Sequence, residues 1–214
     1  MGVTRPGTIA LGALSMAIAI AIVYAAMRES SPAENVRRAD AAGLMNELMS
    51  GTAAVGGPFT LTNAFGKRVS LADFRGKVVV LYFGYTFCPD VCPTDLLAIA
   101  RLLDTPGVDR EQVQPVFVTL DPARDTPAQL ATYVQSFSPR IVALSGTESE
   151  VRAVATSYKV FYEKVRPPGS AHYVIDHTAF IYIIDPQGNY AGFFPPGTGV
   201  ERMSAVVREI AEAK

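Results

Sequence analysis

"KVVVLYFGYTFCPDVCPTDL", residues 77–96, joins a continuous apolar run to the only two cysteines of the chain. The run from Lys77 to Tyr85 is typical of a central strand that is buried on both faces of a sheet. From Pro93 onward the apolar residues return at helical spacing, which predicts a helix after the cysteines. Because Pro93 disfavours α geometry at Cys92, we expect regular helix to begin at Pro93 and residues 88–92 to form a loop.

Short β-rich and helical segments alternate along the chain from Gly57. "FTLTNAFGKRVSL" has the alternation and turn residues of a hairpin, Val113 to Leu120 is a second buried strand, and Thr126 with Pro127 opens a helix. Strands alternating with helices predict an α/β fold, mainly parallel in its first half and closed by a hairpin. The remaining predicted strands are "IVALSG", "HTAFIYIID" and "YAGFFP", and the remaining helices are "TESEVRAVATSYK" and "GVERMSAVVREIAEA".

Composition limits the class of protein. With 214 residues, 49% of them hydrophobic, the chain suits one globular domain plus a further segment. The formal net charge of -1 leaves no basic surface to neutralise phosphates, so nucleic acid is excluded as a partner.

The further segment is the start of the chain. Thr8 to Met27 carries no charged residue and is long enough to cross a bilayer, which predicts a single transmembrane helix and an anchor over residues 1–28. A cleaved signal peptide with a cleavage site at Val23 to Ala25 is the alternative, although the apolar stretch exceeds a usual signal-peptide core. Residues 29–56 are predicted to be a tether that begins with a capped helix at Ser31.

The two cysteines are four residues apart at the start of a helix, where a thiol's pKa is lowered. In regular helix their Cβ atoms would lie about 5 to 6 Å apart, wider than the roughly 3.5 to 4.5 Å of a disulfide. A metal tolerates this separation better, but a loop can adjust, so both a redox pair and a metal site stay open. Two cysteines that act only as small apolar side chains are the third alternative.

Two thiolates do not complete a metal site, so a further ligand is needed. The two histidines of the chain lie in "SAHYVIDHTAFIYIID". His177 opens the predicted apolar strand and follows Asp176, which could orient its imidazole through a hydrogen bond. His172 is five residues earlier and would face the opposite side of a continuous strand, so the two are alternatives. A lone histidine in a strand is also often purely structural.

Four stretches, "GGPFTL", "LYFGYTFCPDVCPTDL", "VTLDPARDTP" and "YVIDHTAFIYIIDPQG", resemble the SCO/SenC family of copper chaperones and occur in that family's order. The resemblance covers about residues 57–212. It implies a thioredoxin-like domain over residues 57–214, preceded by a membrane anchor, that delivers copper to the binuclear copper site of cytochrome c oxidase subunit II. It also implies that Cys88, Cys92 and His177 are the copper ligands.

The donor chemistry agrees with this implication, because two thiolates and one imidazole suit Cu(I), whereas zinc normally wants a fourth ligand. Cu(II) could recruit a further donor such as Asp90 or water. Asp121 follows a central strand at the carboxyl end of the sheet, where it is expected either to support the ligands or to face a partner. Asp90 and Asp176 are assigned to the same supporting or partner-facing group.

The family also implies a location and partners. The domain is expected in the periplasm or an equivalent space, held by a single pass through the inner (cytoplasmic) membrane. Since such a space is oxidising, Cys88 and Cys92 could rest as a disulfide that a thiol reductant opens before an upstream donor supplies copper.

A copper chaperone, which is not an enzyme in the strict sense, is therefore the first hypothesis. The second is a membrane-tethered thiol:disulfide oxidoreductase in which Cys88 attacks and Cys92 resolves, reducing the cysteines of the target's copper site. Against it, three residues rather than two separate the cysteines, and His177 stands where such oxidoreductases usually place a proline. The third hypothesis, a thiol peroxidase, lacks the expected motif because Thr86 is only two residues before Cys88.

Overall fold

The computed structural model describes residues 16, 43, 45–48 and 54–213. The chain divides into two compact units, Met1–Ala53 and Ala54–Lys214, and the second contains the whole α/β part. Most of the predicted anchor and of the predicted tether lies outside the described residues. Within the described ranges, no helix is long and apolar enough to cross a bilayer.

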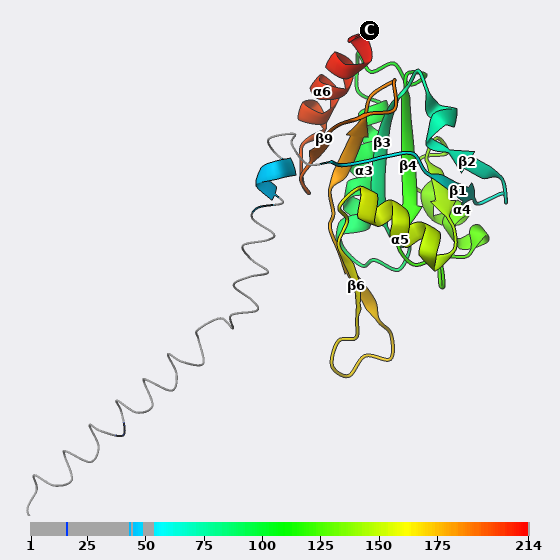
Figure 1. Ribbon diagram of the computed structural model, residues 1–214, viewed down its shortest axis with the longest axis vertical. Helices are drawn as coiled ribbons and strands as arrows, with labels where there is room; N and C mark the ends of the chain where they lie inside the picture. The colour runs from blue at the N-terminus through cyan, green and yellow to red at the C-terminus, as the bar shows by residue number, and fades with distance from the viewer. Residues whose placement is uncertain (1–15, 17–42, 44, 49–53, 214) are drawn as a thin grey trace, which may run out of the picture. The chain divides into compact units, whose positions relative to one another are not determined.

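Seven strands form one mixed sheet, and their bounds are β1 Thr60–Asn63, β2 Arg68–Ser70, β3 Val78–Gly84, β4 Val113–Thr119, β5 Val142–Ser145, β8 Ile181–Ile184 and β9 Tyr190–Phe194 (Figure 1). The strand order is β2-β1-β5-β4-β3-β8-β9. β3, β4 and β5 are parallel, whereas the hairpins at both edges pair antiparallel. The predicted β1–β2 hairpin, parallel centre and closing hairpin are confirmed.

The helices are η1 Leu71–Phe74, α3 Val91–Leu103, α4 Pro127–Gln135, α5 Glu148–Ser157 and α6 Val200–Glu212. As predicted, Thr126 caps α4, because its side chain accepts the N–H of Gln129 and Pro127 takes the first helical position. At α5, the Thr147 and Glu150 side chains satisfy each other's backbone N–H groups in a capping box.

The central strand β3 separates two hydrophobic clusters, and all seven of its residues are buried. Since successive side chains of a strand point to opposite faces, alternate residues of β3 enter different clusters. The first cluster lies between the sheet and α3, α4 and α6, and the second lies under α5 on the other face. From β3 the first receives Val78, Val80 and Tyr82, and the second receives Val79, Leu81 and Phe83.

A separate two-stranded sheet consists of β6 Tyr162–Val165 and β7 Val174–His177, and it projects from the rest of the domain (Figure 1). The prediction of one strand over "HTAFIYIID" was wrong. β7 ends at His177 and pairs with β6, whereas β8 begins at Ile181 and pairs with β3. The chain changes sheets at Thr178, whose N–H and side-chain oxygen both bond the backbone of Phe161.

The sequence prediction also missed β6. A signal was present, since the β-prone residues 160–165 lead into "PPG" at residues 167–169, a turn that joins two strands. Several residues of this hairpin are exposed, so the segment lacks the apolar pattern from which the other strands were predicted.

Truncation of Leu81 to Ala tests the central strand. Leu81 is fully buried, so we expect the Leu81→Ala variant to lose about 2 to 5 kcal/mol of unfolding free energy through lost burial and the cavity that remains. Urea denaturation of the reduced full-length protein measures the loss. Leu97→Ala is the matched control, because Leu97 in α3 is 43% exposed and should change the free energy by less than about 0.5 kcal/mol. Equal losses in the two variants would contradict this account of the core.

Candidate metal centre

Three side chains from two separate parts of the sequence converge at one end of β3. The two sulfur atoms of Cys88 and Cys92 and a ring nitrogen of His177 all lie within 4.8 Å of one another. Cys92 is buried, and the other two are half-buried. Both thiols are free. The structure therefore brings together the three residues that the sequence singled out.

Cys92 lies in the first turn of α3, and this corrects the predicted loop over residues 88–92. The helix begins at Val91, so Pro93 occupies its third position. Proline is tolerated there because the first N–H groups of a helix have no partner within the helix. Of the predicted loop, only residues 88–90 lie before the helix. The N–H of Cys88 donates to the carbonyl of Tyr85 at 3.2 Å.

Gly84 makes room for Cys92 at the end of β3. A Cβ atom at this position would lie 2.8 Å from the sulfur of Cys92 and 3.0 Å from the ring of Phe117. Both separations are shorter than ordinary contacts, so a larger residue would displace the sulfur or the ring. The sequence "FGY" therefore allows the buried thiol to pack directly against the strand.

His177 ends β7 and points its ring at Cys92. Its Nε2 atom is 3.3 Å from the sulfur of Cys92, and its Nδ1 atom is 3.1 Å from the carbonyl oxygen of Thr178. The imidazole meets the rings of Tyr82 and Tyr85 edge-on. Because a carbonyl only accepts hydrogen bonds, Nδ1 carries the proton and Nε2 presents its lone pair to the thiols.

Asp176 does not orient the imidazole, contrary to the sequence expectation. Asp176 is exposed and lies opposite Glu163 in the β6–β7 pair. The carbonyl of Thr178 takes the orienting role instead. Neighbouring side chains of a strand point to opposite faces, so Asp176 and His177 diverge.

The two thiols share one proton unequally. The hydrogen bond from Cys92 lowers the pKa of Cys88 to about 3, against the opposing effect of partial burial. The N–H groups of Asp90 and Cys92 act in the same direction as that bond. The same bond, together with burial, raises the pKa of Cys92. At neutral pH the pair therefore holds one thiolate, on Cys88, and one thiol, on Cys92.

Asp95 is a buried acid near this pair that sequence reasoning missed. Only 3% of Asp95 is exposed, and burial raises its pKa. The hydroxyl of the neighbouring Tyr82 lowers the pKa of Asp95, against the larger effect of burial. Its place three residues after Cys92 was the available signal, because residues at that spacing share one helix face.

The other predicted acids lie outside the cluster. Asp90 is exposed at the N-cap of α3, where its side chain makes no capping bond. Asp121 is completely buried and accepts the Tyr173 hydroxyl at 2.9 and 3.1 Å.

His172 is not in the cluster either. It is exposed, and its backbone forms a local turn with Ser170. Of the two histidines left open by the sequence, only His177 reaches the thiols.

One side of the centre is open. A shallow cavity is lined by Cys88 and His177 and by Tyr85, Pro89, Val91, Val174, Ile175 and Asp176. Cys92 does not line this cavity, so a molecule that approaches from outside meets Cys88 and His177 first.

The sheet order and the cysteines at the start of α3 define a thioredoxin-like domain that carries a dithiol and an imidazole. The sequence profile of the SCO1/SenC family matches residues 48–212. The chain therefore belongs to the SCO1/SenC family.

Similar proteins occur in mitochondria and bacteria. The chain is 40% identical over 168 residues to the mitochondrial SCO1 homolog 1 of Arabidopsis thaliana, covering 76% of this chain and 49% of that protein. It is 34% identical over 182 residues to an SCO2-like protein of Rickettsia prowazekii, covering 85% and 86%. The chain thus spans about half of the first relative and most of the second.

Solved structures share the fold. Copper-bound ScoI of Bradyrhizobium japonicum is 41% identical with a TM-score of 0.67, and the match covers 73% of this chain and 99% of that one. Copper-bound yeast Sco1 is 32% identical with a TM-score of 0.67, and the match covers 76% and 91%.

Alkylation with iodoacetamide tests the shared proton. Because the lowered pKa of Cys88 keeps it a thiolate above about pH 4, we expect its alkylation rate in the reduced, metal-free protein to stay flat between about pH 5 and 8. An ordinary thiol would react about tenfold faster for each pH unit up to its pKa. In Cys92→Ala the main cause of the lowering is lost, so the rate at pH 6 should fall at least about tenfold. A tenfold rise per pH unit in the wild-type protein would contradict the assignment.

Proposed function

We propose that this protein is a copper chaperone that holds Cu(I) through Cys88, Cys92 and His177 and delivers it to the binuclear copper site of cytochrome c oxidase subunit II. The observation that carries the proposal is the convergence of two sulfur atoms and one imidazole nitrogen within 4.8 Å. Relatives with copper bound, at 41% and 32% identity, support copper as the cargo.

The donor set fits Cu(I). Thiolates and imidazole are soft to intermediate ligands, and three of them satisfy Cu(I), whereas a structural zinc normally takes four. Cys88 already carries the negative charge that a metal ligand needs, and His177 presents the lone pair of Nε2. Cys92 releases its proton when copper binds, so binding should release about one proton per copper.

The unequal exposure of the ligands suggests an order of transfer. Cys88 and His177 line the open cavity, whereas Cys92 lies behind them against Gly84. A partner's cysteine or histidine can replace Cys88 or His177 first, while Cys92 remains bound to the copper until the partner's ligands coordinate it. Stepwise exchange of this kind avoids releasing the ion into water.

The proposal includes a location. Residues 1–28 would anchor the chain in the inner (cytoplasmic) membrane, with the domain in the periplasm or an equivalent space. An upstream copper donor would load the site. Where the surroundings oxidise Cys88 and Cys92 to a disulfide, a thiol reductant would first restore the two thiols. Asp90 is the proposed additional donor for Cu(II), and Asp176, exposed beside His177, is the proposed contact with a partner.

A thiol:disulfide oxidoreductase that reduces the target's cysteines is the second candidate. The lowered pKa of Cys88 favours it, because a thiolate at neutral pH is the attacking group in such exchange. Cys92 lies close enough to resolve a mixed disulfide. This activity needs no histidine, and that difference separates the two functions.

Substitution of His177 tests the chaperone directly. We expect the His177→Ala variant to bind Cu(I) more than about 100-fold more weakly, because a direct ligand should matter more than the outer contacts that cost about 10- to 100-fold. Disulfide formation between Cys88 and Cys92 should persist. Competition with a chromogenic chelator under anaerobic conditions measures the affinity, and His172→Ala is the matched control that should bind like the wild type. Unchanged affinity in His177→Ala would remove the imidazole from the site.

Each cysteine is tested by replacement with serine. Cys88→Ser and Cys92→Ser leave one sulfur and one imidazole, and a hydroxyl is a poor ligand for Cu(I), so each variant should lose tight binding by more than about 100-fold. The same chelator competition gives the result. Retention of wild-type affinity by either variant would point to a different set of ligands, and rapid turnover of a disulfide substrate by a wild type that binds no copper would favour the oxidoreductase.

A further inference from the structure

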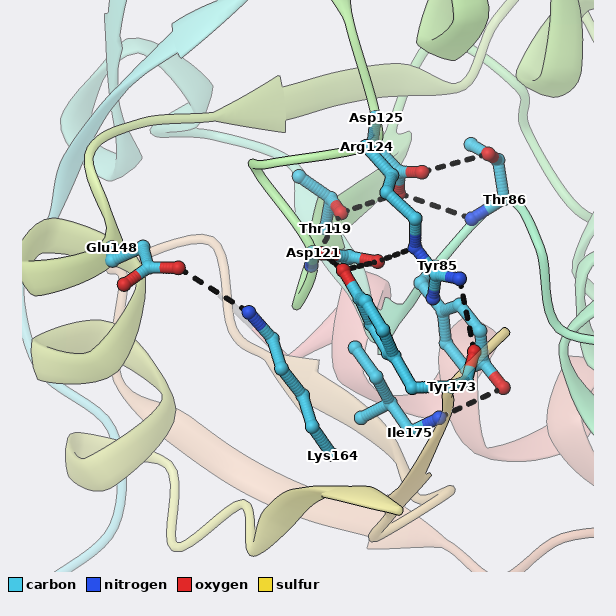
Figure 2. Close-up of polar contacts among 10 residues, drawn as sticks. All are labelled: Tyr85, Thr86, Thr119, Asp121, Arg124, Asp125, Glu148, Lys164, Tyr173 and Ile175. Carbon is cyan, nitrogen blue, oxygen red and sulfur yellow. Dashed lines mark hydrogen bonds and ion pairs between the residues drawn. The ribbon is translucent and has the colours of Figure 1, made fainter. Parts of the chain in front are cut away.

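Two of the three proposed ligands lie on segments that belong neither to the main sheet nor to the helices packed on it. Cys88 is in the short loop before α3, and His177 ends a strand of the separate β6–β7 sheet. An isolated two-stranded hairpin is marginally stable by itself. Side-chain contacts must therefore fix where these segments lie relative to Cys92, and Figure 2 shows that residues 121–125 after β4 supply them.

Asp125 holds the segment that leads to Cys88. Its carboxylate is 1% exposed and accepts the Thr86 N–H at 3.0 Å and the Thr86 hydroxyl at 2.7 Å. It also accepts the hydroxyl of Thr119, at the end of β4, at 2.5 Å. Thr86 is two residues before Cys88, so Asp125 ties the start of the cysteine loop to the central sheet (Figure 2).

Asp121 and Arg124 hold the segment that leads to His177. Tyr173, immediately before β7, donates its hydroxyl to both oxygens of Asp121, and its carbonyl accepts Arg124 Nη1 at 2.9 Å. The guanidinium carbon of Arg124 lies 3.6 Å from the centre of the Tyr173 ring, and Arg124 also pairs with Asp121. The N–H of Ile175 also donates a hydrogen bond to the Tyr85 hydroxyl at 3.1 Å.

These two sets of contacts start from one short turn. Asp125 N–H donates to the carbonyl of Asp121 at 2.9 Å, and Arg124 N–H donates to the same carbonyl at 3.1 Å, so the two carboxylates are held by one compact backbone. Nevertheless each carboxylate reaches a different partner. Asp125 contacts the cysteine side, and Asp121 contacts the histidine side.

We propose that residues 121–125 are a positioning element of the metal centre with two separable arms, Asp125 for Cys88 and Asp121 with Arg124, acting through Tyr173, for His177. The inference rests on the proposed function, since it concerns ligands of the same site. None of these positioning residues belongs to the group of three proposed ligands.

The two arms should control different properties. Copper binding needs both cysteines and His177, whereas disulfide formation needs only the cysteines. Weakening the histidine arm should therefore reduce Cu(I) affinity and leave the thiol–disulfide equilibrium unchanged. Loosening the cysteine arm should let Cys88 approach Cys92 more readily and shift that equilibrium toward the disulfide.

Tyr173→Phe tests the histidine arm, because it removes the hydroxyl that Asp121 accepts and keeps the ring under Arg124. Asp125→Asn tests the cysteine arm, because an amide has one acceptor oxygen where the carboxylate has two. Thr86→Val, which removes one hydroxyl from the same arm, serves as a second variant if Asp125→Asn does not fold. Arg166→Gln is the matched control, since Arg166 is exposed in the same hairpin and, among the described residues, contacts neither Asp121, Arg124 nor Tyr173.

Three measurements on the full-length protein separate the arms. Chelator competition gives Cu(I) affinity. Equilibration with glutathione gives the thiol–disulfide constant, in which the thiols of Cys88 and Cys92 form one disulfide and one glutathione disulfide is reduced to two glutathiones. Proton NMR of the copper-free protein reports the ring of His177, and His172→Ala assigns its signals because the chain has two histidines.

For Tyr173→Phe we expect about a tenfold loss of Cu(I) affinity, the worth of one hydrogen bond to a charged group, with shifted His177 ring signals and an unchanged glutathione constant. For Asp125→Asn, and more weakly for Thr86→Val, we expect a shift of up to about tenfold toward the disulfide and unchanged His177 signals. Arg166→Gln should match the wild type in all three measurements.

The proposal is overturned if Tyr173→Phe leaves both the copper affinity and the His177 signals unchanged, if each arm alters both sets of readouts equally, or if Arg166→Gln does the same as Tyr173→Phe. Failure of the proposed function looks different. In that case the wild type itself binds no Cu(I) tightly, while the NMR signals and the glutathione constant still show whether the two arms act separately.

Discussion

The contact between the sulfur of Cys92 and the backbone of Gly84 fixes the geometry of the whole centre. A Cβ atom on Gly84 would lie 2.8 Å from that sulfur, so only glycine lets the first turn of α3 sit this close to β3. With Cys92 seated there, the Nε2 atom of His177 reaches its sulfur at 3.3 Å. The sulfur therefore packs against a strand that is buried along its full length.

The electrostatics follow from this burial. A thiol enclosed against the sheet resists ionisation, and its proton stays to bond the more open Cys88, which becomes the thiolate. The charge is therefore on the sulfur that borders the cavity, where an incoming cation or disulfide arrives. Asp95 and Tyr82 lie on the buried side, and burial raises the pKa of both groups.

Local pattern was enough to predict β3, the helix after it and the cap of α4, because burial on both faces and capping depend on residues that are neighbours in the sequence. Local pattern was not enough where the structure depends on which segments pair or pack together. The division of "HTAFIYIID" into β7 and β8 depends on which strands lie alongside, and the start of α3 at Val91 depends on packing over β3. The resemblance and the donor chemistry together predicted the three ligands. Predicting Asp95 would have required the observation that it shares the buried face of the helix with Cys92.

The position of His177 distinguishes a metal site from a redox pair on the same fold. A dithiol with one lowered pKa can exchange disulfides without a third group, so that chemistry does not require the imidazole. Here the ring is held by the Thr178 carbonyl and by the edges of Tyr82 and Tyr85, with Nε2 aimed at the sulfur atoms. Fixing an aromatic donor in this way costs rotamer entropy and removes a polar ring from water, a cost that metal coordination at Nε2 would offset. The constraint on His177 is thus better explained by copper binding than by thiol exchange alone.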